Sequence, residues 1–215
     1  MKNAHAPDFG LYVDIVQTLE AIQAPYMIVG AFASTAYGST RTTFDIDMIV
    51  DLKDHHIEQL VQRYPPPRYY ADPVQMRDSI RMGIMFNIID TTAGRKVDIV
   101  PLTMDSRYRR AFGRRVRKQV NAPGLMPFEA WLAQPEDVIL GKLIAWAEGH
   151  SYKHEEDIHA MLVFIYLQAD LDLSHSFDEA DIDAQAVTLG PEVNQLWGRL
   201  KEAARREAKS VISSG

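Results

Sequence analysis

Two kinds of hydrophobic periodicity are present at the start of the chain. In residues 8–25 apolar side chains recur three or four positions apart and a proline ends the run, which predicts a helix. Residues 26–30 and 45–52 are short β-branched and apolar runs, which are typical of buried strands. The small residues of 31–38 predict a tightly packed helix that ends near Gly38.

The same two periods continue up to about residue 100. Residues 53–64 have the pattern of a helix, and the three prolines 65–67 end it. Residues 81–91 and 95–102 are predicted to be neighbouring strands, joined by a turn of hairpin length that contains Gly94.

After residue 130 the pattern is helical throughout. Helices are predicted in 134–149, 153–169 and 191–210, the first with a proline at its start and acidic residues in its first turn. We therefore expect an α+β (mixed α/β) region, 1–130, and a helical C-terminal region, 131–215, that packs on it. The fold class is a mixed sheet flanked by helices, followed by a helical half.

Composition indicates an ordinary globular protein. Hydrophobic residues make up 47% and charged residues 24% of the 215 positions. We find neither an apolar run of membrane-spanning length nor a basic segment followed by an apolar one, so we expect no membrane span, no signal peptide and a cytoplasmic location. The sequence has no cysteine, which excludes disulfides, thiolate catalysis and cysteine-ligated zinc.

The charge pattern gives two opposing indications about nucleic acid. The net charge of −6 argues against non-specific coating of RNA or DNA. Yet Arg107–Lys118 holds seven basic residues, either a solvated helix end that runs into a strand or a phosphate-binding surface. Trp131, Trp146 and Trp197 are predicted to lie in or beside helices and to serve packing rather than base stacking.

Charge also interrupts the strand at 45–52. Asp45 and Asp47 are two positions apart, so both point to one face of a strand, about 7 Å apart along the backbone. A hairpin strand could add Asp98 to the pair, and three carboxylates without histidine favour Mg²⁺ or Mn²⁺ as the cofactor. The alternative is a solvent-facing strand, or one paired with Arg41 and Arg95.

Upstream, the predicted strand ends at Gly30 and the small-residue helix follows directly. Such a strand-to-helix turn presents free backbone N–H groups and the positive end of the helix dipole, which suits a triphosphate. The segment VGAFASTAYGSTRTTFDIDMIV resembles the signature of the DNA polymerase β-type nucleotidyltransferase superfamily, in particular its AbiEii-like bacterial branch, which includes toxin components of toxin–antitoxin systems. The pattern is matched by Val29-Gly30-Ala31 and by Arg41-Thr42-Thr43-Phe44-Asp45-Ile46-Asp47. The resemblance covers about residues 26 to 160.

The resemblance implies a role for each matching residue. Asp45, Asp47 and Asp98 would be catalytic and would hold the metal, and Asp98 would help to deprotonate the acceptor hydroxyl. The implied nucleotide-binding residues are Gly30, Ala31, Ser34, Arg41, Thr43, Lys142 and Asp157. On this basis the sheet is of the nucleotidyltransferase type.

Two positions depart from the family pattern. Ala31 stands where the family has a second glycine, so that Ser34 or Thr35 would have to supply any hydroxyl required there. His154 stands at the first acid position of a Lys-Asp-x-x-Asp helix start, in which Asp157 is kept.

The expected function is Mg²⁺-dependent transfer of a nucleoside monophosphate group from an NTP to an acceptor. RNA or tRNA bound through Arg107–Lys118, a protein, or a small molecule as in antibiotic-type adenylyltransferases are the alternative acceptors. An antitoxin partner is a further expectation from the resemblance. The alternative function is a non-catalytic nucleotide-binding or interaction module that retains the metal-binding strand.

Overall fold

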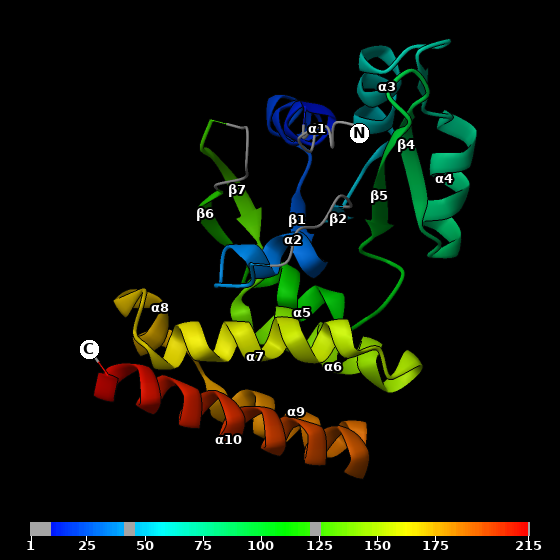
Figure 1. Ribbon diagram of the computed structural model, residues 1–215. Coiled ribbons are helices and arrows are strands. Elements are labelled where there is room, and N and C mark those ends of the chain that lie inside the picture. Colours follow the sequence, from blue (N-terminus) through cyan, green and yellow to red (C-terminus); the bar gives the residue numbers. More distant parts are fainter. Residues whose placement is uncertain (1–9, 41–45, 121–125, 215) are drawn as a thin grey trace, which may run out of the picture. The chain divides into compact units, whose positions relative to one another are not determined.

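Figure 1 shows the computed structural model of the chain, which describes residues 10–40, 46–120 and 126–214. The chain divides by its internal packing into two units. One comprises Met1–Phe32 and Thr43–Ala133, and the other comprises Ala33–Thr42 and Gln134–Gly215. The division passes through the short helix α2 (Gly30–Thr35), so residues 33–42 belong to the helical unit although they are distant from it in sequence.

Seven strands of the described residues form one sheet, in the spatial order β3-β4-β5-β2-β1-β7-β6. Their bounds are β1 (Tyr26–Val29), β2 (Asp47–Val50), β3 (Tyr69–Tyr70), β4 (Phe86–Asp90), β5 (Arg95–Pro101), β6 (Val116–Val120) and β7 (Phe128–Leu132). β1 runs parallel to β7 and β2 runs parallel to β5, whereas the other neighbouring pairs are antiparallel. The predicted mixed sheet is confirmed.

Helices flank this sheet, as predicted. Their bounds are α1 (Gly10–Ala21), α3 (Asp54–Arg63), α4 (Pro73–Met82) and α5 (Tyr108–Gly113). α1 packs against β5, α4 packs against β4, and α3 packs against α4. The buried side of α1 includes Ile15, Val16 and Leu19, the helical stripe that predicted it.

The second unit consists of helices in its described residues. They are α6 (Pro135–Gly149), α7 (Tyr152–Tyr166), α8 (Leu171–Ser176), α9 (Glu179–Leu189) and α10 (Pro191–Ser214), besides the end of α2. α10 runs alongside α7 and α9, and α6 packs against α7 and α9 (Figure 1). The predicted helical half is confirmed. None of the helices in the described parts of the chain has both the length and the apolar character needed to cross a membrane.

The predicted hairpin of 81–91 and 95–102 is confirmed with one correction. β4 and β5 pair antiparallel, and Gly94 takes a positive φ of 62° in the turn between them. Residues 81 and 82, however, belong to α4 and not to the strand. α4 ends there because Gly83 adopts the left-handed conformation that caps a helix, and β4 starts only at Phe86.

A second correction concerns Trp131. It lies in strand β7 and not in or beside a helix. Its ring is half-buried and carries the guanidinium of Arg115 at 5.0 Å from the ring centroid. The prediction failed because β6 and β7 are short strands with charged residues on one side, so their apolar positions are too few to define a period.

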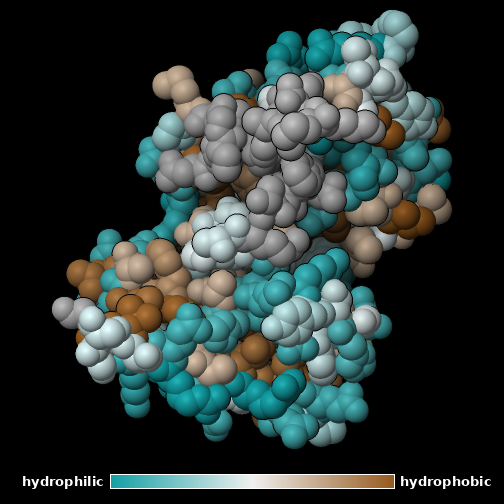
Figure 2. Space-filling model, in the orientation of Figure 1, coloured by the Kyte–Doolittle hydropathy of each residue, from teal (hydrophilic) through white to brown (hydrophobic). Residues whose placement is uncertain are grey.

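The surface of the first unit carries an apolar patch beside its edge strand. Val74, Met82, Ile84 and Met85 of the α4–β4 segment are all exposed. Figure 2 shows brown, apolar surface over α4. The core itself is formed by residues of the central strands, among them Met48 of β2, which is fully buried next to Asp47.

Candidate active site

The acids of the two central strands lie opposite one another. Asp47 is the first residue of β2, and it is the register partner of Asp98 in the parallel strand β5. Adjacent strands are about 4.8 Å apart, and register partners project from the same face of a sheet. Asp98 is in turn opposite Asn87 of β4. Three polar residues therefore form a row across β2, β5 and β4, and it was a parallel pairing rather than a hairpin that brought Asp98 to Asp47.

The Asp98 carboxylate is held by two side chains. The ammonium of Lys96 donates to Asp98 Oδ1 at 2.9 Å and to Oδ2 at 3.1 Å, and the amide of Asn87 donates to Oδ1. The Asp98 side chain is 13% exposed, whereas the Lys96 side chain is 50% exposed. A half-exposed lysine thus neutralises a mostly buried acid. The sequence prediction named neither Lys96 nor Asn87, although a lysine two positions before the acid on the same strand is a signal of a partner on the same face.

Gly30 lies against the other acid. Its φ of 68° is in the left-handed region, and a Cβ added there would stand 2.3 Å from Asp47 Oδ2. Val29, the preceding residue, is the register partner of Asp47 in the antiparallel pair of β1 and β2. Glycine is therefore required at position 30 for two separate reasons, the backbone conformation and the space that the Asp47 carboxylate fills.

Three predicted site residues, Arg41, Thr43 and Asp45, lie outside the described residues. Within 10–40, 46–120 and 126–214, no group of three or more histidine, aspartate or glutamate side chains is arranged to hold a metal ion. The described part of the candidate metal site is consequently the pair Asp47 and Asp98.

Other predicted residues meet in the helical unit. Lys142 of α6 donates to Asp157 Oδ2 of α7 at 2.6 Å, and both side chains are almost fully buried. Ser39 donates to Asp157 Oδ1 at 2.8 Å. Ser34, also fully buried, offers its carbonyl to the backbone N–H of Ser39 at 3.0 Å. Lys142, Asp157 and Ser39 form a buried cluster, which we call the Asp157 cluster; Ser39 was not among the predicted site residues.

The Asp157 cluster holds the segment around Ser39 against α7. Ser39 lies two positions before the gap at 41–45, and Gly38 lies so close to α7 that an added Cβ would be 2.4 Å from Phe164 Cβ. The cavity of about 570 Å³ beside the cluster is lined by Glu155, Glu156 and Asp157. Its acidic lining is unsuited to phosphate groups.

The basic segment Arg107–Lys118 forms α5 and the start of β6, so a helix does run into a strand here, as in one of the two alternatives for this segment. Part of its charge is already compensated, because Arg107 pairs with Asp105 and Arg117 pairs with Glu129. Arg115 stacks on Phe112 and Trp131, and burial lowers the pKa of its guanidinium. The phosphate-binding alternative for this segment stays a prediction.

No protein-family model matches the chain, and no curated protein matches it in sequence. Among solved structures, the chain is similar to the crystal structure of an antigenic nucleotidyltransferase-like protein from Paracoccidioides brasiliensis, with 16% sequence identity and a TM-score of 0.46. That similarity covers 87% of this chain and 90% of the other. At this identity and TM-score the likeness does not assign a function to the chain.

Proposed function

We propose that the chain is a Mg²⁺- or Mn²⁺-dependent nucleotidyltransferase that moves a nucleoside monophosphate group from an NTP to an acceptor nucleophile and releases pyrophosphate. The observation that carries the proposal is the pairing of Asp47 with Asp98 in neighbouring parallel strands, with Gly30 against the Asp47 carboxylate. The sequence resemblance to the AbiEii-like branch, which includes these three residues, also supports the proposal.

The donor set fits a hard divalent cation. Asp47 and Asp98 offer carboxylate oxygens without histidine or cysteine, which is the ligand chemistry that Mg²⁺ and Mn²⁺ prefer. Lys96 is half exposed, so its ammonium can leave Asp98 when a cation binds. A cation held there, with Asp45 as a further ligand, would neutralise the nucleotide phosphates.

The protein groups have separate roles in the proposed reaction. Asp98 accepts the proton of the acceptor hydroxyl, because its carboxylate is already oriented by Asn87. The turn at Gly30 would approach the triphosphate through its backbone, and the resemblance implies phosphate contacts for Arg41 and Thr43. For Lys142 and Asp157 the resemblance implies nucleotide contacts, whereas their mutual hydrogen bond and that of Ser39 support a structural role within the helical unit.

The alternative is a nucleotide-binding module without turnover. It is favoured by Ala31 at the second glycine position of the family pattern and by His154 at an expected acid position. The ion pair of Lys96 with Asp98 favours it as well. The acceptor also stays open within the proposal. RNA or tRNA is favoured by the exposed arginines of Arg107–Lys118, and an antitoxin partner is expected if the protein acts as a toxin.

The test is label transfer from each of the four α-labelled NTPs, with Mg²⁺ and either total RNA or a cell lysate. We expect transfer by the wild type and its loss, by at least about a hundredfold, in Asp47→Asn and Asp98→Asn. Asp51→Asn removes an exposed acid from the end of the same strand and is the matched control. Nucleotide binding without transfer for any NTP would reject the enzyme in favour of the module. Growth arrest or altered antibiotic susceptibility of cells that express the protein separates a toxin from a small-molecule transferase.

A further inference from the structure

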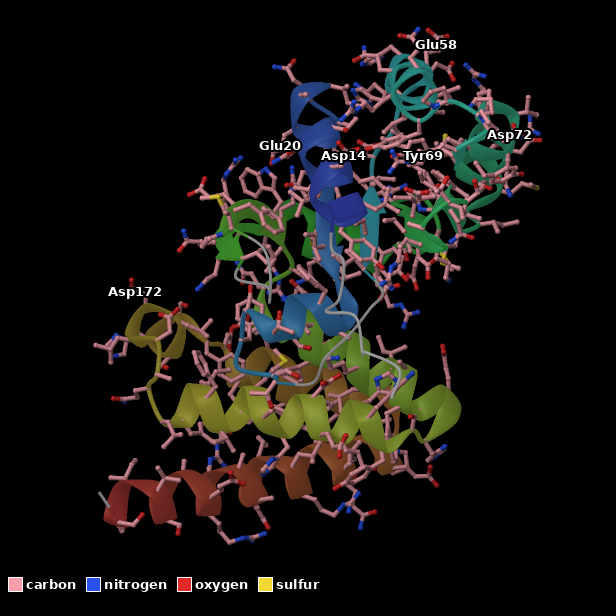
Figure 3. All side chains as sticks on the ribbon, turned by 45° about the horizontal axis from the view of Figure 1, so that its top comes forward. Asp14, Glu20, Glu58, Tyr69, Asp72 and Asp172 are labelled. Carbon is pink, nitrogen blue, oxygen red and sulfur yellow. The ribbon has the colours of Figure 1, made fainter. Side chains whose placement is uncertain are left out.

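A second polar hollow lies in the first unit, on α1, α3, β3 and the β4–β5 turn. Its volume is about 530 Å³, and its charged and aromatic lining consists of Asp14, Arg63, Arg68, Tyr69, Asp90 and Arg95. We call it the arginine pocket. Figure 3 shows Asp14 on the side of α1 that faces Tyr69. Arg95 and Asp98 are three positions apart on β5, so they point to opposite faces of the strand and the pocket is separate from the acid pair.

Two of the three arginines in the pocket are paired. Arg63 donates to Asp14, and Arg68 donates to Asp90 Oδ2 at 3.0 and 3.2 Å while it stacks on the Tyr69 ring. The other oxygen of Asp90 accepts from the backbone N–H groups of Thr92 and Ala93, both at 3.0 Å. Asp14 thus accepts through one oxygen, and Asp90 accepts through both.

Arg95 differs from its neighbours. It is half-buried, and its side chain makes no hydrogen bond or ion pair within the described ranges, although its register partner across β4 and β5 is Asp90. Among the described residues, the pocket lining holds three guanidinium groups and two carboxylates, in a chain whose net charge is −6. The Asp90 carboxylate opposite Arg95 already accepts from Arg68 and from two backbone N–H groups, so a bound anion would give the Arg95 guanidinium the hydrogen bonds that Asp90 does not.

We propose that the arginine pocket binds the terminal phosphate of a phosphomonoester. Arg95 supplies a two-point hydrogen bond, and the outer N–H groups of Arg63 and Arg68, both more than half exposed, reach the remaining oxygens. A tetrahedral dianion presents oxygens in three directions, whereas a planar carboxylate is satisfied by a single guanidinium. The hollow is large enough for a sugar phosphate or a mononucleotide.

The test is isothermal titration calorimetry of the full chain with ribose 5-phosphate, with EDTA present so that the acid pair carries no metal. We expect binding that ribose and succinate do not reproduce. Arg95→Gln should weaken it about tenfold or more, and Arg95→Lys, which keeps the charge but not the two-point contact, by less. Arg81→Gln removes an exposed arginine of α4 outside the pocket and should leave the affinity unchanged. Circular dichroism establishes that each variant is folded.

The proposal would be overturned by no heat with ribose 5-phosphate up to about 10 mM, or by equal binding by wild type and both Arg95 variants. Equal binding of succinate would also reject it, because it would show a general anion site. Asp47→Asn should bind the sugar phosphate as well as the wild type does, so the outcome is independent of the transferase proposal. A 5′-phosphorylated dinucleotide, compared with its 5′-hydroxyl form, tells a nucleic-acid end from a small metabolite as the source of the phosphate.

Discussion

Gly30→Ala is the most direct perturbation of the acid pair, because the added methyl group meets the Asp47 carboxylate. The new Cβ would stand 2.3 Å from Asp47 Oδ2 but 3.5 Å from Asp47 Cβ. Rotation of the short Asp47 side chain relieves the contact and costs about 0.5–1.5 kcal/mol if the new torsion is off a rotamer. The left-handed φ of 68° adds about 1–2 kcal/mol for any residue with a Cβ. The free energy of unfolding should therefore fall by roughly 1.5–3.5 kcal/mol in all.

Gly94→Ala is the matched control for the backbone contribution. Gly94 has a φ of 62° and nothing within 4 Å of an added Cβ, and it lies in the same unit. Gly94→Ala should lower the free energy of unfolding, measured by urea titration, by only about 1–2 kcal/mol. The additional fall in the free energy of unfolding for Gly30→Ala, relative to Gly94→Ala, should disappear in an Asp47→Ala background, because the clashing oxygen is then absent. Equal falls in the free energy of unfolding for the two glycine variants would contradict a clash between the new methyl group and the Asp47 carboxylate. So would a larger fall for Gly30→Ala that persists when the Asp47 carboxylate is absent. Label transfer should be abolished by Gly30→Ala and retained by Gly94→Ala.

Three further changes test the surrounding structure. Asp157→Ala leaves Lys142 buried without its counter-charge and should lower the free energy of unfolding by about 3–5 kcal/mol in urea titrations; a loss below about 1 kcal/mol would mean that the cluster is not structural. Gly38→Ala should cost more than Gly30→Ala, because Phe164 Cβ, 2.4 Å from the new methyl, is fixed by the helix backbone and cannot rotate away; thermal unfolding of both variants decides this. Burial alone would raise the pKa of Asp90, but its backbone and arginine hydrogen bonds hold that pKa below the usual value. Its stabilisation is therefore complete above about pH 4 and lost as the pH falls through the lower folded value, so Asp90→Asn should flatten the acid side of the stability profile, and an unchanged slope would contradict this.

Elements with local signals were predictable from the sequence. The β4–β5 hairpin has apolar strands and a turn glycine close together in the chain, and the structure agrees with that prediction. α4 was missed although its signals are equally local. Asp72 accepts from the N–H groups of Val74 and Gln75, proline follows it, and Gly83 caps the other end. These capping residues, rather than its few buried positions, define the helix.

The partners of the acids were not predictable in the same way. Asp47 and Asp98 are 51 positions apart in sequence, and their register depends on β2 running parallel to β5 and not on any turn. Ser39 and Asp157 are 118 positions apart, and their contact assigns residues 33–42 to the helical unit. A one-dimensional pattern contains neither the strand order nor the path of the chain between units.

The charged residues Asp47 and Asp98 in the otherwise apolar strands β2 and β5 can be explained without a metal ion. Lys96 and Asn87 both donate to Asp98, so the acid row is partly compensated by the protein itself. A metal site whose ligands repel one another would be destabilising in the empty state, whereas here a half-exposed lysine can hold the place of a cation and move to solvent when one binds. The same lysine would compete with the metal, so Lys96→Gln should tighten Mn²⁺ binding to the chain even as it lowers stability in the absence of metal. A structural ion pair that never opens would instead leave the Mn²⁺ affinity unaffected, and this difference separates a metal-binding row from a salt bridge on a strand.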